Sequence, residues 1–148
     1  MPKFEAARID LESHPGYSRL LEKGFRVLGE SASTILAEPG VKMVFFVDDP
    51  NRQRETLDMV VIASEIKDLF SGIEIGCFIT DVRKARALAA SFGIRKLPSI
   101  GFWSNEEFLG SIDGLQNWDD YMAKIPEVLT RTKGPERTIA ILSNSPEE

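Results

Sequence analysis

The stretch of sequence that decides the fold is "FGIRKLPSIGFWSNEEFLGSIDG", residues 92–114. Pro98 opens an apolar run, 97–103, which is typical of a strand that is entered through a proline. The polar residues "SNEE" form a turn, and a second apolar run, 108–113, returns in the opposite direction. Because so short a connection can only join antiparallel neighbours, this stretch predicts a β-hairpin.

Strands and helices alternate upstream of this hairpin. Apolar runs predict interior strands at 41–47 and 73–80 and a shorter strand at 25–28. Helical spacing of apolar residues predicts a helix after each of them, and the last of these helices closes on Gly93. The face of the helix between the two interior strands is formed by Met59, Ile62, Ala63, Ile66, Leu69 and Phe70. The element order βαβαβαββα, preceded by a short helix at 17–24, predicts an α/β fold with one mixed sheet flanked by helices.

A last helix follows the hairpin. Asn117 is expected to cap it, with Asp120 three residues later as in a capping box. Pro126 lies inside the helical pattern, so we expect it to kink the helix or to end it early. The buried face is predicted to consist of Trp118, Tyr121, Met122, Ile125 and Leu129.

Length and charge limit the classes of function. A chain of 148 residues suits one domain, and a net charge of −5 gives no electrostatic basis for binding nucleic acid. No apolar run is long enough to span a membrane, and the charged start of the chain lacks the apolar core of a signal peptide. We therefore expect a cytoplasmic protein.

The two ends of the chain are polar. Residues 1–16 are expected to be a flexible segment, with "SHPG" as a turn, and residues 17–133 to form the domain. Residues 134–148 are expected to be a polar tail. The apolar "TIAIL" within that tail is consistent either with an added edge strand or with a disordered segment.

Residues 92–114 resemble the second half of a thioredoxin. That family has the pattern aromatic–Gly–Ile–Arg, two more residues, and Pro–Thr ahead of a strand, a turn and a second strand. Pro98 falls on its cis-proline, so the resemblance implies a thioredoxin-like fold with the loop 47–58 beside Pro98. Thioredoxins carry Cys-X-X-Cys in that loop, but the only cysteine here, Cys77, lies within an apolar strand. Disulfide exchange needs an accessible thiolate and a partner thiol, so we expect no redox reaction.

A narrower resemblance is found in "DDPNRQRETLDMVVIASEI", residues 48–66. It is similar to the matching segment of hydrogenase expression/formation proteins of the HupG/HyaE kind, and the final helix also resembles theirs. The matching residues are Asp49, Pro50, Arg52, Glu55 and Asp58. The resemblance implies a non-catalytic chaperone for the small subunit of a nickel–iron hydrogenase. It would hold the twin-arginine signal peptide of that subunit before export.

The expected partner-binding residues are Asp48, Asp49, Glu55, Asp58, Lys96, Leu97 and Pro98. The acidic residues would engage a basic peptide, and the backbone before Pro98 would pair with its main chain. Plainer roles remain open, since Asp58 equally suits a helix cap and the Asp48–Asp49 pair suits a solvated turn. Arg52 and Arg54 partly cancel the acidic charge of the loop.

Two other classes of function stay open. One is a thiol oxidoreductase that uses Cys77, and the other is a structural module of a larger assembly. We expect no cofactor and no metal ion, because one cysteine and the single histidine, His14, do not make a ligand set.

Overall fold

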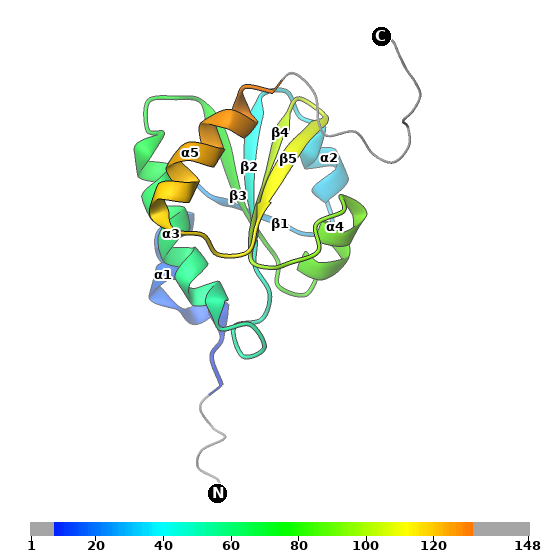
Figure 1. Ribbon diagram of the computed structural model, residues 1–148. Helices are drawn as coiled ribbons and strands as arrows, with labels where there is room; N and C mark the ends of the chain where they lie inside the picture. Colours follow the sequence, from blue (N-terminus) through cyan, green and yellow to red (C-terminus); the bar gives the residue numbers. More distant parts are fainter. Residues whose placement is uncertain (1–7, 132–148) are drawn as a thin grey trace, which may run out of the picture.

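The fold is built on one five-stranded sheet. The computed structural model describes residues 8–131, so the predicted tail 134–148 and its "TIAIL" segment lie outside the described residues. The sheet order is β1-β3-β2-β4-β5, with β1 and β2 parallel to β3, and with β4 antiparallel to both β2 and β5 (Figure 1). The strands are β1 (Arg26–Leu28), β2 (Val41–Phe46), β3 (Ile75–Thr80), β4 (Ser99–Ser104) and β5 (Glu107–Asp113).

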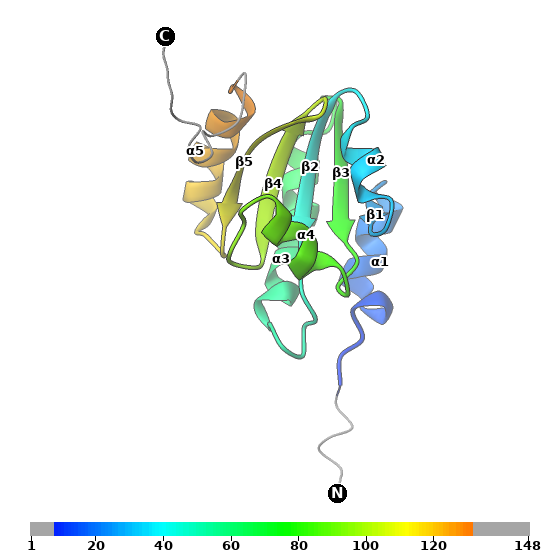
Figure 2. The ribbon, with the colours of Figure 1, turned by 90° about the vertical axis from the view of Figure 1, so that its right-hand side faces the viewer.

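Helices cover both faces of the sheet. One face carries α1 (Pro15–Glu22), α3 (Glu55–Leu69) and α5 (Trp118–Leu129), and the other carries α2 (Ala32–Leu36) and α4 (Ala85–Ser91) (Figures 1 and 2). A hydrophobic cluster fills each side of the sheet, and side chains of β2 and β3 contribute to both. This double covering explains why the sequences of β2 and β3 are continuously apolar instead of alternating.

The expected order βαβαβαββα and the mixed sheet are confirmed. Gly93 follows α4 with φ of 76°, as expected of a residue that ends a helix. Asn117 occupies the N-cap position of α5, but its side chain makes no capping hydrogen bond.

Three details of the helices differ from expectation. Asp58 is not a cap, because α3 begins at Glu55 and Asp58 lies in its first turn. Pro126 does not end α5 early, because the helix continues to Leu129. Trp118 is 40% exposed, although helical spacing assigns it to the buried face, because it is the first residue of α5 and extends beyond the core.

The segment ahead of residue 17 packs on the domain from residue 8 onward. Leu11 is buried in a short 3₁₀ helix, η2 (Leu11–Ser13), and α1 already begins at Pro15. The "SHPG" sequence thus starts a helix: proline suits its first position, and Nδ1 of His14 accepts a hydrogen bond from the N–H of Gly16. The domain therefore starts before residue 17, while residues 1–7 lie outside the described part.

Candidate functional site

The candidate site is the loop between β2 and α3, residues 47–54. The hydroxyl of Thr80 in β3 accepts a hydrogen bond from the N–H of Val47 and donates one to its carbonyl, at 2.9 and 3.2 Å. The hydroxyl of Thr56 in α3 donates to the carbonyl of Asp48 at 2.9 Å. Two buried hydroxyls thus fix the first two residues of the loop, one to β3 and the other to α3, which holds this end of the loop in one position.

The loop lies beside the cis peptide bond between Leu97 and Pro98. Nε2 of Gln53 donates a hydrogen bond to the carbonyl oxygen of Leu97 at 2.6 Å. The expected cis-proline and the expected neighbourhood of loop and proline are therefore confirmed. Pro98 and Leu97 are buried, whereas Lys96 is exposed. The carbonyl of Leu97, which was expected to be open to a partner's main chain, is engaged by Gln53.

Asp48 is a buried residue, with only 2% of its surface exposed. One carboxylate oxygen accepts a hydrogen bond from the N–H of Asp49 at 2.7 Å, and the other accepts one from Nε of Arg86 at 2.8 Å. The carboxylate of Asp48 is thus occupied within the protein, where it ties the loop to α4.

Asp49 and Asn51 form a compact unit next to it. One carboxylate oxygen of Asp49 accepts hydrogen bonds from the main-chain N–H of Asn51 at 3.0 Å and from its side-chain amide at 2.8 Å. These two bonds, with Arg8 and Arg52 nearby, lower the pKa of the Asp49 carboxyl, so that Asp49 carries its charge at neutral pH.

The remaining carboxylates are at the surface. Glu55 and Asp58 are both exposed in the first turn of α3, where negative charge is favoured by the helix dipole. Of the four predicted acidic residues, Asp49, Glu55 and Asp58 can therefore be reached from solvent.

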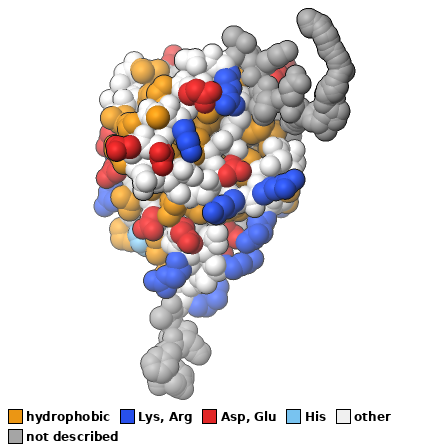
Figure 3. All heavy atoms as spheres, in the orientation of Figure 1, with side chains coloured by type: hydrophobic (Ala, Val, Ile, Leu, Met, Phe, Trp, Pro, Cys, Tyr) orange, Lys and Arg blue, Asp and Glu red, His pale blue; other side chains and the backbone are white. Residues whose placement is uncertain are grey.

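Basic side chains also surround the loop, and most of them were not among the predicted partner-binding residues. Among residues 8–131, no ion pair is found for Arg52, Arg54, Arg95 and Lys96. Arg86 and Arg95 line a groove of about 550 Å³ whose wall includes Leu97. On the face of the molecule that Figure 3 shows, acidic and basic side chains are interspersed over the lower part. The site is therefore of mixed sign, and Arg86 had no sequence signal beyond its positive charge.

Cys77 lies away from this loop, in the interior strand β3. It is 5% exposed, and burial raises the pKa of its thiol to about 11. A thiol with so high a pKa is almost entirely protonated at neutral pH, and the protonated form is a poor nucleophile.

The described part of the chain offers no metal site and no membrane-spanning helix. Residues 8–131 contain no group of three or more histidine, cysteine or acidic side chains placed to hold a metal ion. None of the helices there combines the length and the apolar character that a membrane crossing requires.

Solved structures share this architecture. The chain is similar to the thioredoxin of Plasmodium falciparum, with a TM-score of 0.55 and 12% identity, over 69% of this chain and 96% of that one. The chain is thus a thioredoxin-fold protein whose characteristic loop contains no cysteine.

Sequence comparison narrows the class. Residues 17–121 match the model of the family described as hydrogenase-1 expression protein HyaE, and the chain belongs to this family. It is 30% identical to the hydrogenase expression/formation protein HupG of Bradyrhizobium diazoefficiens over 101 residues, which is 68% of each chain. It is 31% identical to the hydrogenase expression/formation protein HoxO of Azotobacter vinelandii, over 68% of this chain and 67% of that protein.

Proposed function

We propose that this protein is a non-catalytic binding protein in the formation of a nickel–iron hydrogenase. Its partner is the hydrogenase small subunit. The protein binds the twin-arginine signal peptide of that subunit before export. Membership of the HyaE family and the similarity to the hydrogenase expression/formation proteins HupG and HoxO support the hydrogenase connection. The observation that carries the binding role is the loop after β2, which presents carboxylate and amide side chains where thioredoxins have their thiols.

The chemistry of the loop favours binding over reaction. Asp49, Asn51 and Gln53 are fixed by hydrogen bonds to the backbone or to each other, and the only thiol of the chain is buried in β3. A preformed set of acceptors suits recognition of a cationic partner, because little side-chain entropy is then lost on binding.

The exposed carboxylates set the kind of partner. Arginine side chains can engage carboxylates through two parallel hydrogen bonds, and Asp49, Glu55 and Asp58 offer three carboxylates over ten residues of chain. Each exposed pair contributes only about 0.2–1 kcal/mol, so several must act together. Arg52, Arg54 and Arg95, which have no ion pair among residues 8–131, oppose a general attraction of cations. Selectivity thus depends on the spacing of the partner's arginines more than on net charge.

The test is calorimetric titration of a small-subunit signal peptide containing the twin arginines. We expect Asp49→Asn/Glu55→Gln/Asp58→Asn to weaken binding at least tenfold, and high salt to weaken binding to the wild type. Asp48 is left unchanged, because its carboxylate is buried and structural.

The matched control is Glu22→Gln/Glu74→Gln/Glu106→Gln. These glutamates are exposed and lie outside the candidate site, and their replacement changes the net charge by the same amount. If both triple variants lose the same affinity, the effect is one of net charge and the carboxylates at the loop are not the recognition element. Absence of binding to the wild type would refute the proposed partner.

A further inference from the structure

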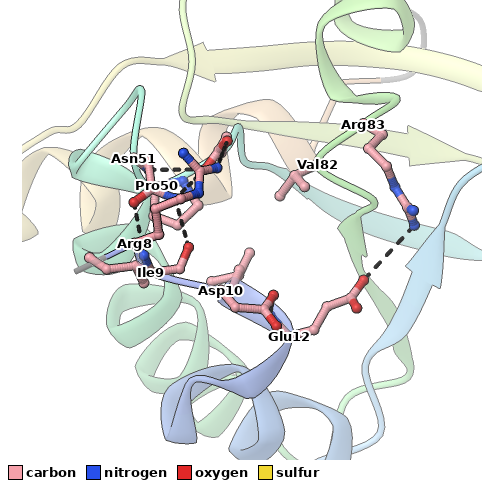
Figure 4. Close-up of a pocket in the computed structure, with 10 residues that line it drawn as sticks. Arg8, Ile9, Asp10, Glu12, Pro50, Asn51, Val82 and Arg83 are labelled. Carbon is pink, nitrogen blue, oxygen red and sulfur yellow. Dashed lines mark hydrogen bonds and ion pairs between the residues drawn. The ribbon is translucent and has the colours of Figure 1, made fainter. Parts of the chain in front are cut away.

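The loop already holds an extended segment of its own chain. The N–H of Ile9 donates to Oδ1 of Asn51 at 2.8 Å, and Nδ2 of Asn51 donates to the carbonyl of Ile9 at 2.7 Å (Figure 4). One amide side chain thus satisfies both main-chain groups of a single residue, as the neighbouring strand of a sheet would. Such a contact recognises the direction and the extended conformation of a main chain. It does not involve the side chain of Ile9.

A charge contact accompanies this main-chain contact. Nη2 of Arg8 lies 3.7 Å from Oδ2 of Asp49, and its side chain is 74% exposed. Oδ1 of Asp49 is held by Asn51, which leaves Oδ2 free to face the guanidinium. Asp49 and Asn51 therefore act as one acceptor set, with the carboxylate for an arginine and the amide for the residue that follows it.

A hollow of about 320 Å³ lies beneath the segment. Leu11 and Val82 give it apolar walls, and a contact of 4.0 Å between Glu12 and Arg83 bridges its other side (Figure 4). The hydrogen bonds of Ile9 are exposed at the rim, whereas Leu11 is buried. Arg8 and Ile9 can thus leave the loop while Leu11 stays anchored.

We infer that Asp49 and Asn51 form a docking site for an extended peptide that presents an arginine followed by a residue with a free main-chain N–H and carbonyl, and that Arg8 and Ile9 are its resident occupants. An external peptide must displace them to bind. The inference rests on the proposed function for the identity of the external partner, whereas the site and its occupant stand on the contacts described above.

The resident segment competes because it is tethered. An intramolecular occupant acts at an effective concentration on the order of millimolar when its linker is short. An external peptide can bind only to molecules whose site is open. Its apparent affinity is therefore its intrinsic affinity multiplied by the fraction of molecules in which the resident segment has left the site. Release of the resident segment should therefore raise the affinity of a peptide of the same chemistry.

The test uses full-length protein and the fluorescent peptide FEAARIDL, which copies residues 4–11. In the variant Arg8→Ala/Ile9→Pro, the resident segment loses its cation and the N–H that Asn51 accepts. We expect this variant to bind the peptide at least tenfold more tightly than wild type by fluorescence anisotropy. Adding Asn51→Ala should remove the gain, and the peptide FEAAAIDL should bind weakly to every variant.

The single variant Arg8→Ala guards against misfolding, because a side chain that is 74% exposed can be removed without loss of packing. It should bind the peptide more tightly than wild type, by a smaller factor. The inference would be overturned if wild type and both variants bound the peptide equally, or if binding survived Asn51→Ala. The contacts of Arg8 and Ile9 would then be structural only.

Competition by a twin-arginine signal peptide separates the two proposals. If FEAARIDL binds through Asn51 but the signal peptide does not compete, the docking site stands and the proposed partner fails. If the signal peptide binds equally well with and without Asn51→Ala, the partner stands and the docking site fails.

Discussion

The carboxylate of Asp48 and the guanidinium of Arg86 are joined by a hydrogen bond of 2.8 Å across 38 positions of sequence. The carboxylate is 2% exposed and the arginine side chain 61%. A buried charge is costly without a partner, so this pair holds the loop after β2 against α4. Asp48 is thus a structural residue within a loop whose other carboxylates face solvent.

Removal of the cation should destabilise the fold. We expect Arg86→Met to lower the free energy of unfolding by about 1–3 kcal/mol, because a buried acceptor loses its charged donor. The measurement is urea denaturation. Arg83→Met is the matched control, since Arg83 pairs with Asp81 at the surface, and it should cost less than about 1 kcal/mol. If both variants lost the same unfolding free energy, the pair of Asp48 and Arg86 would contribute no more to stability than a surface ion pair.

Cys77 should be unreactive in the native protein. With a thiol pKa of about 11, roughly one molecule in a thousand carries the thiolate at pH 8, and the side chain is buried as well. A chromogenic disulfide reagent should therefore label Cys77 only when urea unfolds the protein. Rapid labelling in buffer, together with disulfide reductase activity that Cys77→Ser abolishes, would instead support the thiol oxidoreductase.

The same thiol should make stability fall at alkaline pH. Burial raises the pKa of Cys77 from 9.0 to about 11, so the folded state holds this proton more tightly than the unfolded state. The resulting stabilisation is complete below pH 9 and is lost between pH 9 and pH 11. The difference in unfolding free energy between wild type and Cys77→Ala should shrink by about 1 kcal/mol from pH 7.5 to pH 10. If the difference in unfolding free energy between wild type and Cys77→Ala stayed constant over this pH range, the predicted effect of the buried thiol would be wrong.

Gly101 in β4 should tolerate no side chain. A methyl group there would lie 2.8 Å from the ring of Trp103 and 3.0 Å from that of Phe46, both in the core. We expect Gly101→Ala to lower the unfolding free energy by about 1–3 kcal/mol in chemical denaturation. For Gly29→Ala, whose added carbon would meet Asp81 at an ordinary 3.6 Å, the change should stay within about 0.5 kcal/mol.

Gln53 should limit access to the backbone edge before Pro98, because its amide occupies the carbonyl of Leu97. If a bound peptide pairs with that edge, Gln53→Ala should strengthen its binding roughly two- to tenfold, the factor that corresponds to about 0.5–1.5 kcal/mol for one hydrogen bond. The readout is peptide titration. Gln116→Ala removes a similar bond, to the carbonyl of Asp113, and should leave affinity unchanged. An unaltered affinity in Gln53→Ala would mean that side chains alone make the contact.

Local sequence patterns predicted the order of elements. The interior strands show as continuous apolar runs, and the hairpin shows through Pro98 and its short turn. These signals act over a few residues and so survive in a single sequence. Trp118 shows their limit: helical spacing indicates a face, but whether another element covers the helix end is decided by tertiary packing.

The composition of the site was less predictable, because it depends on contacts between distant residues. Asp48 and Asp49 are identical neighbours in sequence, yet one is buried against Arg86 and the other faces solvent. Nothing local distinguishes them. The pairing of Ile9 with Asn51 joins residues 42 positions apart, and a polar N-terminal segment gives no sign of it.

The segment that leads into α1 and the carboxyl-terminal end of α5 lie at opposite ends of the sheet (Figure 1). This arrangement decides how the protein should be attached to a sensor surface or an affinity resin. A tag fused ahead of residue 1 is joined to the chain only seven positions before Arg8, so that a basic or histidine-rich tag can itself compete for the carboxylate of Asp49. Anchoring through the carboxyl-terminal end joins the surface to the chain beyond α5 and adds no foreign residue ahead of Arg8, so that a captured peptide reports on the protein and not on its tag.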